Sequence, residues 1–506
     1  FQQPQPGSTS VDTVRSLAME DPQQPPLYFL LDRLWVQALG NPIQALFGSP
    51  LTASRLLPAL MSLLSLPFMY ALAGELFASQ AVALLATAFL ALSPFEILFA
   101  QTACQSSLLT LATLASHYLL LQASRLSDVP TIRSRDVLKR PPPVWQHWGL
   151  YTLTVTLGLY THPLFALTLV GHAIVTMRAA IAPQQRKLSQ RMMGFWLSLL
   201  AAVVLYAPWM VVLANNVRSA LDTLQPTAAT PSVASLAKRW VLSLTALFLD
   251  LDLRFGTAWT FGLRLLILGL LVWAFYTLYR RDDRASFFVL VATGVPLLAL
   301  ALPEAMLSSP RSTINRYWLL CYPGVQLAIA YFLATRLAPK PHYRSSRPSP
   351  AASSRFSLRL TPYALAQLNR WFWRIVLLAL FAASLASCTL SAASNTWWHE
   401  GRSYFNATVA DRVNAKLNPL LVSDAGEAST NLSDLISLSY RLNPNVRLLL
   451  LNNADWVATR SFTAQTEGST IVAFHPSQPL KEALERSRGT LQPLLPEANV
   501  WQVPAP

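Results

Sequence analysis

The chain has 506 residues, of which 53% are hydrophobic and only 12% are charged. Soluble domains carry roughly 25% charged residues, so the composition excludes an ordinary soluble protein and predicts an integral membrane protein. The formal net charge of +15 does not indicate nucleic-acid binding, because the lysines and arginines lie mainly in short loops between apolar stretches.

Residues 1–54 precede the first long apolar stretch and carry the first candidate for chemistry. Glu20 and Asp21 stand shortly before the sequence QPPLY of residues 24–28. The two prolines fix φ and stiffen the approach to a helix. The stretch 27–39 is too short to cross about 30 Å of hydrocarbon, so we expect a helix that lies along the membrane interface within an external loop.

The rest of the chain contains about ten stretches of roughly 20 mainly apolar residues, the length that crosses a bilayer. The predicted spans are 55–78, 80–99, 103–123, 147–161, 164–182, 193–214, 258–279, 285–303, 317–335 and 371–393. The loops that are rich in arginine and lysine alternate with these spans, and they lie at 124–146, 186–191, 280–284 and 336–370.

The positive-inside rule places these basic loops in the cytoplasm. Residues 1–54 and the C-terminal tail then lie outside. One upstream span with a cytoplasmic N-terminus is the simplest way to deliver residues 1–54 to that side, so we expect about eleven spans in the intact protein.

The predicted membrane core therefore covers 55–335. Residues 336–370 are rich in Pro, Ser and Arg without apolar periodicity, which predicts a basic cytoplasmic linker before the last span, 371–393. Residues 394–506 are more polar and predict a small extracytoplasmic α/β domain. Its expected strands are 419–423, 446–451 and 471–474, and its expected helices are 432–442 and 478–487. The expected fold class is an all-α polytopic membrane protein with a small C-terminal α/β domain.

The predicted topology gathers polar and charged side chains at the external surface. They are Glu20, Asp21, Glu96, Gln101, Thr102, His162, Glu304, Arg311 and Arg316, and Tyr317 opens the next span. The guanidinium groups of Arg311 and Arg316 offer planar forks of donors that suit a phosphate at headgroup depth. A carboxylate opposite them would act as a general base or hold a divalent cation, Mg or Mn.

Each of these features also has a structural explanation. Arg311 and Arg316 would anchor a helix end to lipid headgroups. Glu20 and Asp21 would form a solvated turn or a helix terminus, and His162 would be an interfacial histidine.

Several short sequences resemble the GT-C superfamily of membrane glycosyltransferases, in the family-39-like branch of the protein O-mannosyltransferases and the aminoarabinose transferases of lipid A. The resemblance covers about residues 20–335. It rests on QPPLY at 24–28, RLLPAL at 55–60, LSPF at 92–95, GLYTH at 158–162, YAPW at 206–209 and RY at 316–317.

The resemblance implies transfer of a sugar from a polyprenyl-phosphate donor to a lipid, glycan or protein acceptor outside the cytoplasmic membrane. It implies that a base-assisted acceptor attacks the anomeric carbon while arginines or a metal stabilise the departing lipid phosphate. On this basis we expect Glu20 and Asp21 to be catalytic. The residues expected to bind substrate are Gln24, Tyr28, Gln101, His162, Arg311, Arg316 and Tyr317.

The chain also departs from the family pattern. Gln24 stands where the family usually has His, and residues 101–104 read QTAC where the family commonly has QEAR. The family's principal catalytic Asp follows its first span, so we expect it upstream of Phe1. Two alternatives remain: a catalytically inactive GT-C-fold protein that binds lipid-linked saccharide, and a transporter or flippase, which would predict internal repeats.

Overall fold

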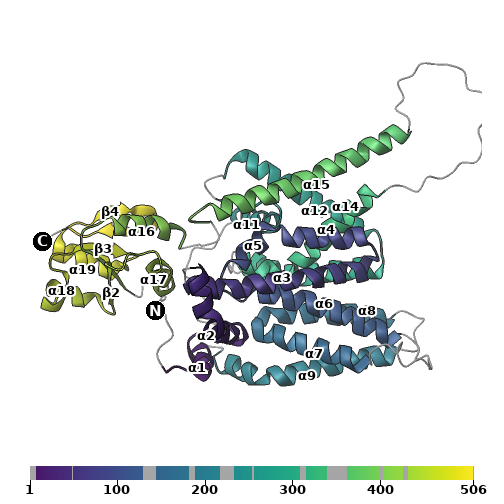
Figure 1. The fold of residues 1–506 in the computed structure, drawn as a ribbon, viewed down its shortest axis with the longest axis horizontal. Coiled ribbons are helices and arrows are strands. Elements are labelled where there is room, and N and C mark those ends of the chain that lie inside the picture. Colours follow the sequence, from purple (N-terminus) through teal and green to yellow (C-terminus); the bar gives the residue numbers. More distant parts are fainter. Residues whose placement is uncertain are drawn as a thin grey trace, which may run out of the picture. The chain divides into compact units, whose positions relative to one another are not determined.

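A computed structural model describes residues 7–47, 50–128, 144–181, 188–216, 233–252, 256–307, 315–338, 362–397, 403–424 and 431–504 (Figure 1). The chain divides into two compact units. One is helical and comprises Thr9–Leu251 and Phe255–Leu390. The other is built mainly from Ser391–Pro506 and contains the sheet.

The helical unit is a bundle of long apolar helices, several of which run side by side in Figure 1. Its first helices are α1 (Ser10–Glu20), α2 (Leu27–Phe47), α3 (Pro50–Phe77), α4 (Gln80–Ala91), α5 (Pro94–Ala100), α6 (Ser106–Asp128) and α7 (Val144–Thr161). They are followed by η2 (Pro163–Phe165), α8 (Ala166–Ile181), α9 (Leu188–Asn215), α11 (Val233–Thr245), α12 (Ala258–Tyr279), α13 (Arg284–Leu307), η5 (Asn315–Leu320), α14 (Tyr322–Leu337) and α15 (Pro362–Ala392).

Every predicted span falls on a helix or on two helices in succession. By length and composition, five described helices can cross a membrane, namely α3, α9, α12, α13 and α15. The pair α4 and α5 bends by 55° and gives a sixth if it is one broken span. These helices confirm a polytopic membrane protein, and the total of about ten spans stays a prediction.

Helix α14 has 16 residues, fewer than the roughly 20 that cross a bilayer, and it lies at the centre of the helical unit. Residues on all its sides are buried, as expected for a helix at the centre of a bundle. It packs against α4, α12 and α13. A Cβ at Gly324 would overlap the Thr293 side chain, so glycine is required for this close approach of α13.

Helix α6 carries a buried polar stripe made of Ser106, Thr110, Thr113 and His117. Their spacing puts them on one helix face, and each is at most 4% exposed. The stripe explains why α6 is less apolar than its neighbours. We call these four residues the α6 polar stripe.

The α6 polar stripe ends in a hydrogen-bonded network that joins three helices. His117 Nδ1 lies 2.7 Å from His172 Nε2 on α8. The other nitrogen of His172, Nδ1, lies 2.9 Å from the Tyr151 hydroxyl on α7. All three side chains are buried, and polar groups inside a bundle stabilise helix association by pairing in this way.

The N-terminal region differs from the expected loop with one short interfacial helix. It contains two helices, because α1 was not predicted and α2 continues to Phe47 through Pro42. Helix α1 begins at a capping box in which Thr9 and Asp12 bond each other's backbone N–H groups. Helix α2 packs against α3.

The C-terminal unit has a five-stranded sheet in the order β2-β1-β3-β5-β4. Strand β1 pairs in parallel with β2 and β3, and β5 pairs antiparallel with β3 and β4. The strands are β1 (Pro419–Asp424), β2 (Arg447–Leu451), β3 (Thr470–Phe474), β4 (Gln492–Leu495) and β5 (Val500–Gln502). The helices are α16 (Asn406–Asn414), α17 (Asn431–Ser439), α18 (Arg460–Thr466) and α19 (Gln478–Arg488).

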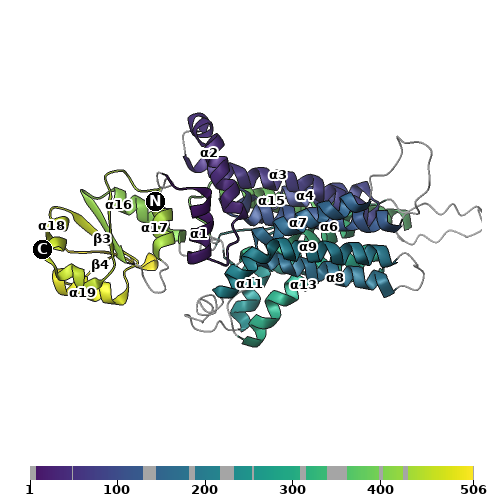
Figure 2. The ribbon, with the colours of Figure 1, turned by 90° about the horizontal axis from the view of Figure 1, so that it is seen from below.

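Successive side chains along each strand point to opposite faces of the sheet, so apolar side chains form a core on each face. Leu420 and Val422 pack with α18 and α19, while Leu421 packs with α16 and α17. Figure 2 shows the strands between α16 and α19. The predicted α/β character of this region and its three predicted strands are confirmed.

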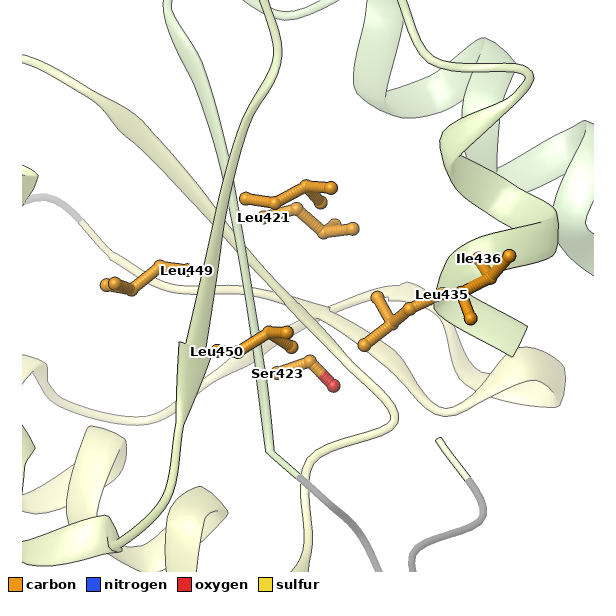
Figure 3. A pocket seen from close by; sticks show the side chains of 7 residues that line it. Leu421, Ser423, Leu435, Ile436, Leu449 and Leu450 are labelled. Atoms are coloured by element: carbon orange, nitrogen blue, oxygen red, sulfur yellow. The ribbon is translucent and has the colours of Figure 1, made fainter. Parts of the chain in front are cut away.

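The space between this sheet and α17 is too small for a ligand. Figure 3 shows Leu421 and Leu450 of adjacent strands near Leu435 of α17, around about 10 Å³ of free space. One water needs roughly 10–15 Å³ on this measure.

We expect His172→Leu to destabilise the helical unit. The substitution leaves the Tyr151 hydroxyl and His117 without their hydrogen bonds, and an unsatisfied buried group costs about 1–3 kcal/mol. Unfolding in detergent, followed by circular dichroism, measures the loss. His147→Leu is the matched control, because Nδ1 of His147 has no hydrogen-bond partner among the described residues. Equal destabilisation by both variants would contradict a stabilising network.

Candidate substrate site at one end of the helical unit

The loop between α1 and α2 is held against the bundle by its backbone. Pro22, Pro25 and Pro26 are buried. The Trp209 indole N–H on α9 donates to the Pro22 carbonyl at 3.2 Å. The proline-rich approach seen in the sequence is therefore a packed loop, and its position depends on α9.

Gln24 lies at the meeting point of this loop and the start of α6. The Gln105 side-chain amide donates to the Gln24 amide oxygen at 2.6 Å. Gln105 is 8% exposed and directly precedes the α6 polar stripe. Gln24 thus lies beside another side-chain amide. Sequence reasoning missed Gln105 because the two residues are far apart in the sequence.

Tyr28 and Asp32 lie one turn apart on α2. Tyr28 is 2% exposed and packs with Leu57 and Leu108. Its hydroxyl is buried and has no hydrogen-bond partner among the described residues. Burial raises the pKa of the Asp32 carboxyl, and a hydrogen bond with Ser54 opposes that shift. Sequence reasoning missed Asp32 as a site residue, although its i+4 spacing from Tyr28 puts both on one helix face.

Glu96 is a second buried carboxylate at this end. The bend between α4 and α5 places it in the first turn of α5, where the Ser93 hydroxyl accepts a hydrogen bond from the Glu96 N–H. Glu96 is 3% exposed, and the Thr110 hydroxyl donates to its Oε2 at 3.4 Å. The sequence suggested a surface acid, whereas the structure turns Glu96 toward the α6 polar stripe.

His162 and Tyr317 are brought together from distant parts of the chain. Nδ1 of His162 accepts a hydrogen bond from the Leu164 N–H at 3.1 Å, which caps η2. The rings of His162 and Tyr317 meet edge to face, with centroids 5.9 Å apart. The Tyr160 hydroxyl, two residues before His162, donates to the Leu205 carbonyl on α9 at 3.0 Å, one turn from Trp209, which holds Pro22. His162 and Tyr317 therefore lie at the same end as the loop that carries Gln24 and its partner Gln105. We call this end, with residues 21–28, Glu96, Gln105, His162 and Tyr317, the substrate end.

The remaining predicted residues are placed differently. Glu20 ends α1 and Asp21 follows it as the C-cap, and both are exposed. Gln101 is exposed at the end of α5. Arg311 lies outside the described residues, and so does the side chain of Arg316, whose backbone belongs to η5. The roles predicted for these residues stay predictions.

A divalent cation finds no ready site in the described part of the chain. No group of three or more His, Cys, Asp or Glu residues there is arranged to hold a metal ion. The expected Mg or Mn ion therefore stays a prediction.

Residues 37–219 match the model of the dolichyl-phosphate-mannose-protein mannosyltransferase family. Among solved structures, apo ArnT from Cupriavidus metallidurans is 14% identical with a TM-score of 0.50, over 98% of this chain and 94% of that one. The resemblance to the GT-C glycosyltransferases is thereby confirmed. It is a likeness of fold, which extends through the C-terminal unit as well as the predicted membrane core.

More distant structures give lower similarity. The archaeal oligosaccharyltransferase AglB from Archaeoglobus fulgidus, solved with an inhibitory peptide and a dolichol-phosphate, is 11% identical with a TM-score of 0.46. The alignment covers 94% of this chain and 68% of AglB. No curated protein matches the chain in sequence.

We expect Asp32→Asn to stabilise the protein at about pH 7 and not at about pH 3.5. Because burial raises the pKa of Asp32, the folded state holds this proton more tightly than the unfolded state. The contribution of Asp32 to the free energy of unfolding is fully present below the pKa of Asp in the unfolded chain, about 3.9. This contribution is lost as the pH rises through the higher pKa of Asp32 in the folded protein. Thermal unfolding in detergent measures the difference.

Asp12→Asn is the control for Asp32→Asn. Hydrogen bonds from Thr9 lower the pKa of Asp12, so this variant should give no gain at about pH 7. If Asp32→Asn raised the unfolding temperature equally at both pH values, the effect would not come from proton binding at Asp32.

Proposed function

We propose that this protein is a membrane glycosyltransferase that moves a sugar from a polyprenyl-phosphate donor to a lipid, glycan or protein acceptor. The observation that carries the proposal is the substrate end, where Gln105 bonds Gln24, Thr110 bonds Glu96 and the rings of His162 and Tyr317 are in contact. The family match over residues 37–219 includes the start of α6 and His162. The proposed location is the extracytoplasmic face of the cytoplasmic membrane, as the basic loops predict.

The proposed reaction has one bond-forming and one bond-breaking event at the anomeric carbon. The acceptor loses a proton to a carboxylate, Glu20 or Asp21, and its oxygen or nitrogen attacks that carbon. The bond from the carbon to the phosphate oxygen breaks, and polyprenyl phosphate leaves with the bonding electron pair. Arg311 and Arg316 stabilise the negative charge of this leaving group.

The polar residues of the substrate end position the two substrates. Gln24, Tyr28 and Gln101 are proposed to contact the sugar or acceptor, because each offers a donor and an acceptor for hydroxyl groups. His162 and Tyr317 present an aromatic surface against which a sugar or prenyl chain can pack. Asp32 and Glu96, being buried, are proposed to support these groups.

The second candidate is a GT-C-fold protein that binds lipid-linked saccharide without transferring it. The exposure of Glu20 and Asp21 favours this alternative, because catalytic carboxylates usually lie in water-poor sites. A transfer assay decides between the two functions.

We expect the intact protein in liposomes to transfer sugar from a polyprenyl-phosphate donor and to release polyprenyl phosphate. Asp21→Asn should lower turnover by about 10²–10⁴, the usual contribution of a general base. Asp12→Asn, at the other end of α1, is the control and should retain activity. Donor binding without any transfer would support the second candidate, a protein that only binds lipid-linked saccharide. Wild-type turnover by Asp21→Asn would show that Asp21 has no catalytic role and only forms part of a turn.

We expect Arg311→Ala and Arg316→Ala each to weaken donor binding by about tenfold or more, the value of one lost charge-assisted hydrogen bond. Binding of a polyprenyl-phosphate sugar to the purified protein measures the effect. Arg336→Ala is the control, because Arg336 lies in the last turn of α14 and stacks on Trp273. Unchanged affinity for the polyprenyl-phosphate sugar in both test variants would show that these arginines do not bind the donor phosphate.

A further inference from the structure

A cavity of about 490 Å³ lies between helices at the opposite end of the helical unit. Its polar lining includes Glu75, Arg125, Arg178, Arg191, Asp282 and Arg284. Arg125 lies 19 residues beyond Ser106 on α6, and at 1.5 Å per residue that is roughly 30 Å from the substrate end. This cavity is therefore a separate site, and its volume falls in the range of about 300–1,000 Å³ seen for ligand pockets.

The charges that line the cavity are unequal. Four arginines, Arg125, Arg178, Arg191 and Arg284, and three carboxylates, Glu75, Asp282 and Asp283, line the cavity. Glu75 pairs with Arg125 at 3.1 Å, and Asp282 pairs with Arg178 at 2.9 Å. The third, Asp283, pairs with Arg281. The cavity therefore has a net positive lining that favours an anion.

Arg191 is the buried one among the four arginines that line the cavity. It comes from the first turns of α9 and is 7% exposed. One of its terminal nitrogens donates to the Ser124 carbonyl on α6 at 3.3 Å. This bond holds the guanidinium between two helices, and a guanidinium removed from water is stabilised strongly by an anionic acceptor.

The rest of the lining is apolar and suits a hydrocarbon chain. Leu120 and Leu121 of α6, Val175 of α8 and Phe288 of α13 face the same space as the arginines. Arg178 also stacks on Phe287, with its guanidinium 4.1 Å from the ring centroid. A ligand that fills the cavity must combine a negative head with an apolar body.

We propose that this cavity is a binding site for the phosphate headgroup of an anionic phospholipid. The basic loops predict that this end faces the cytoplasm, where basic pockets between transmembrane helices bind anionic lipid headgroups. The lipid phosphate accepts from Arg191 and Arg284, and its acyl chains lie along the leucines and Phe288. Binding there would hold α6, α8 and α9 together.

The test compares lipids bound to the purified full-length protein by native mass spectrometry and by thermal unfolding. The probes are phosphatidylglycerol, phosphatidylcholine and inorganic phosphate. We expect phosphatidylglycerol to bind more tightly and to raise the unfolding temperature more than phosphatidylcholine. Arg191→Gln should weaken phosphatidylglycerol binding by about tenfold, equivalent to one lost charge-assisted hydrogen bond.

Arg280→Gln is the matched control. Arg280 is exposed and lies in the turn between α12 and α13, beside the cavity but outside its lining. The Arg280→Gln substitution removes one positive charge at the same end of the helical unit, as Arg191→Gln does. It should change phosphatidylglycerol binding by less than about twofold. If Arg191→Gln fails to fold, Arg284→Gln provides the same comparison at an exposed lining position.

Three results would overturn the proposal. The first is equal binding of phosphatidylglycerol and phosphatidylcholine. The second is equal loss in the Arg280 control and in the cavity variant. The third is binding of inorganic phosphate as tightly as phosphatidylglycerol, which would identify a soluble phosphate ligand in place of a lipid.

Discussion

Polar side chains inside a helical bundle must find partners within the protein, because lipid offers none. Helix α6 and the residue before it meet this requirement at three levels along its buried face. At one end Gln105 bonds Gln24, in the middle Thr110 bonds Glu96, and farther on His117 joins His172. Gln105 and the α6 polar stripe therefore join α6 to the loop before α2, to α5 and to α8, and the substrate end depends on that arrangement.

The two ends of the helical unit have different chemistry. The substrate end combines amides, buried carboxylates and aromatic rings, which suits recognition of sugar hydroxyls. The opposite end presents an arginine-lined cavity whose carboxylates are already paired. The sugar of a polyprenyl-phosphate donor suits the first kind of surface, whereas an anionic headgroup without a sugar suits the second.

The sequence predicted the elements better than their contacts. Apolar length located the spans, and alternating residues located β1, β2 and β3, because both patterns are local. Helix α1 was missed, although Thr9 and Asp12 form a readable capping box. Glu96 was expected at the surface, but the bend at Ser93 turns it inward. The pairing of Gln24 with Gln105 depends on tertiary packing and leaves no signal in a single sequence.

The most direct test of the account is to map where a polyprenyl-phosphate donor binds. The intact protein in membranes would be labelled with a photoreactive polyprenyl-phosphate sugar, and the labelled peptides would be identified by mass spectrometry. The account predicts labels in residues 21–28, at the start of α6 and around Tyr317, all suppressed by unlabelled polyprenyl phosphate. Labels confined to the cavity around Arg191 or to the C-terminal unit would contradict it.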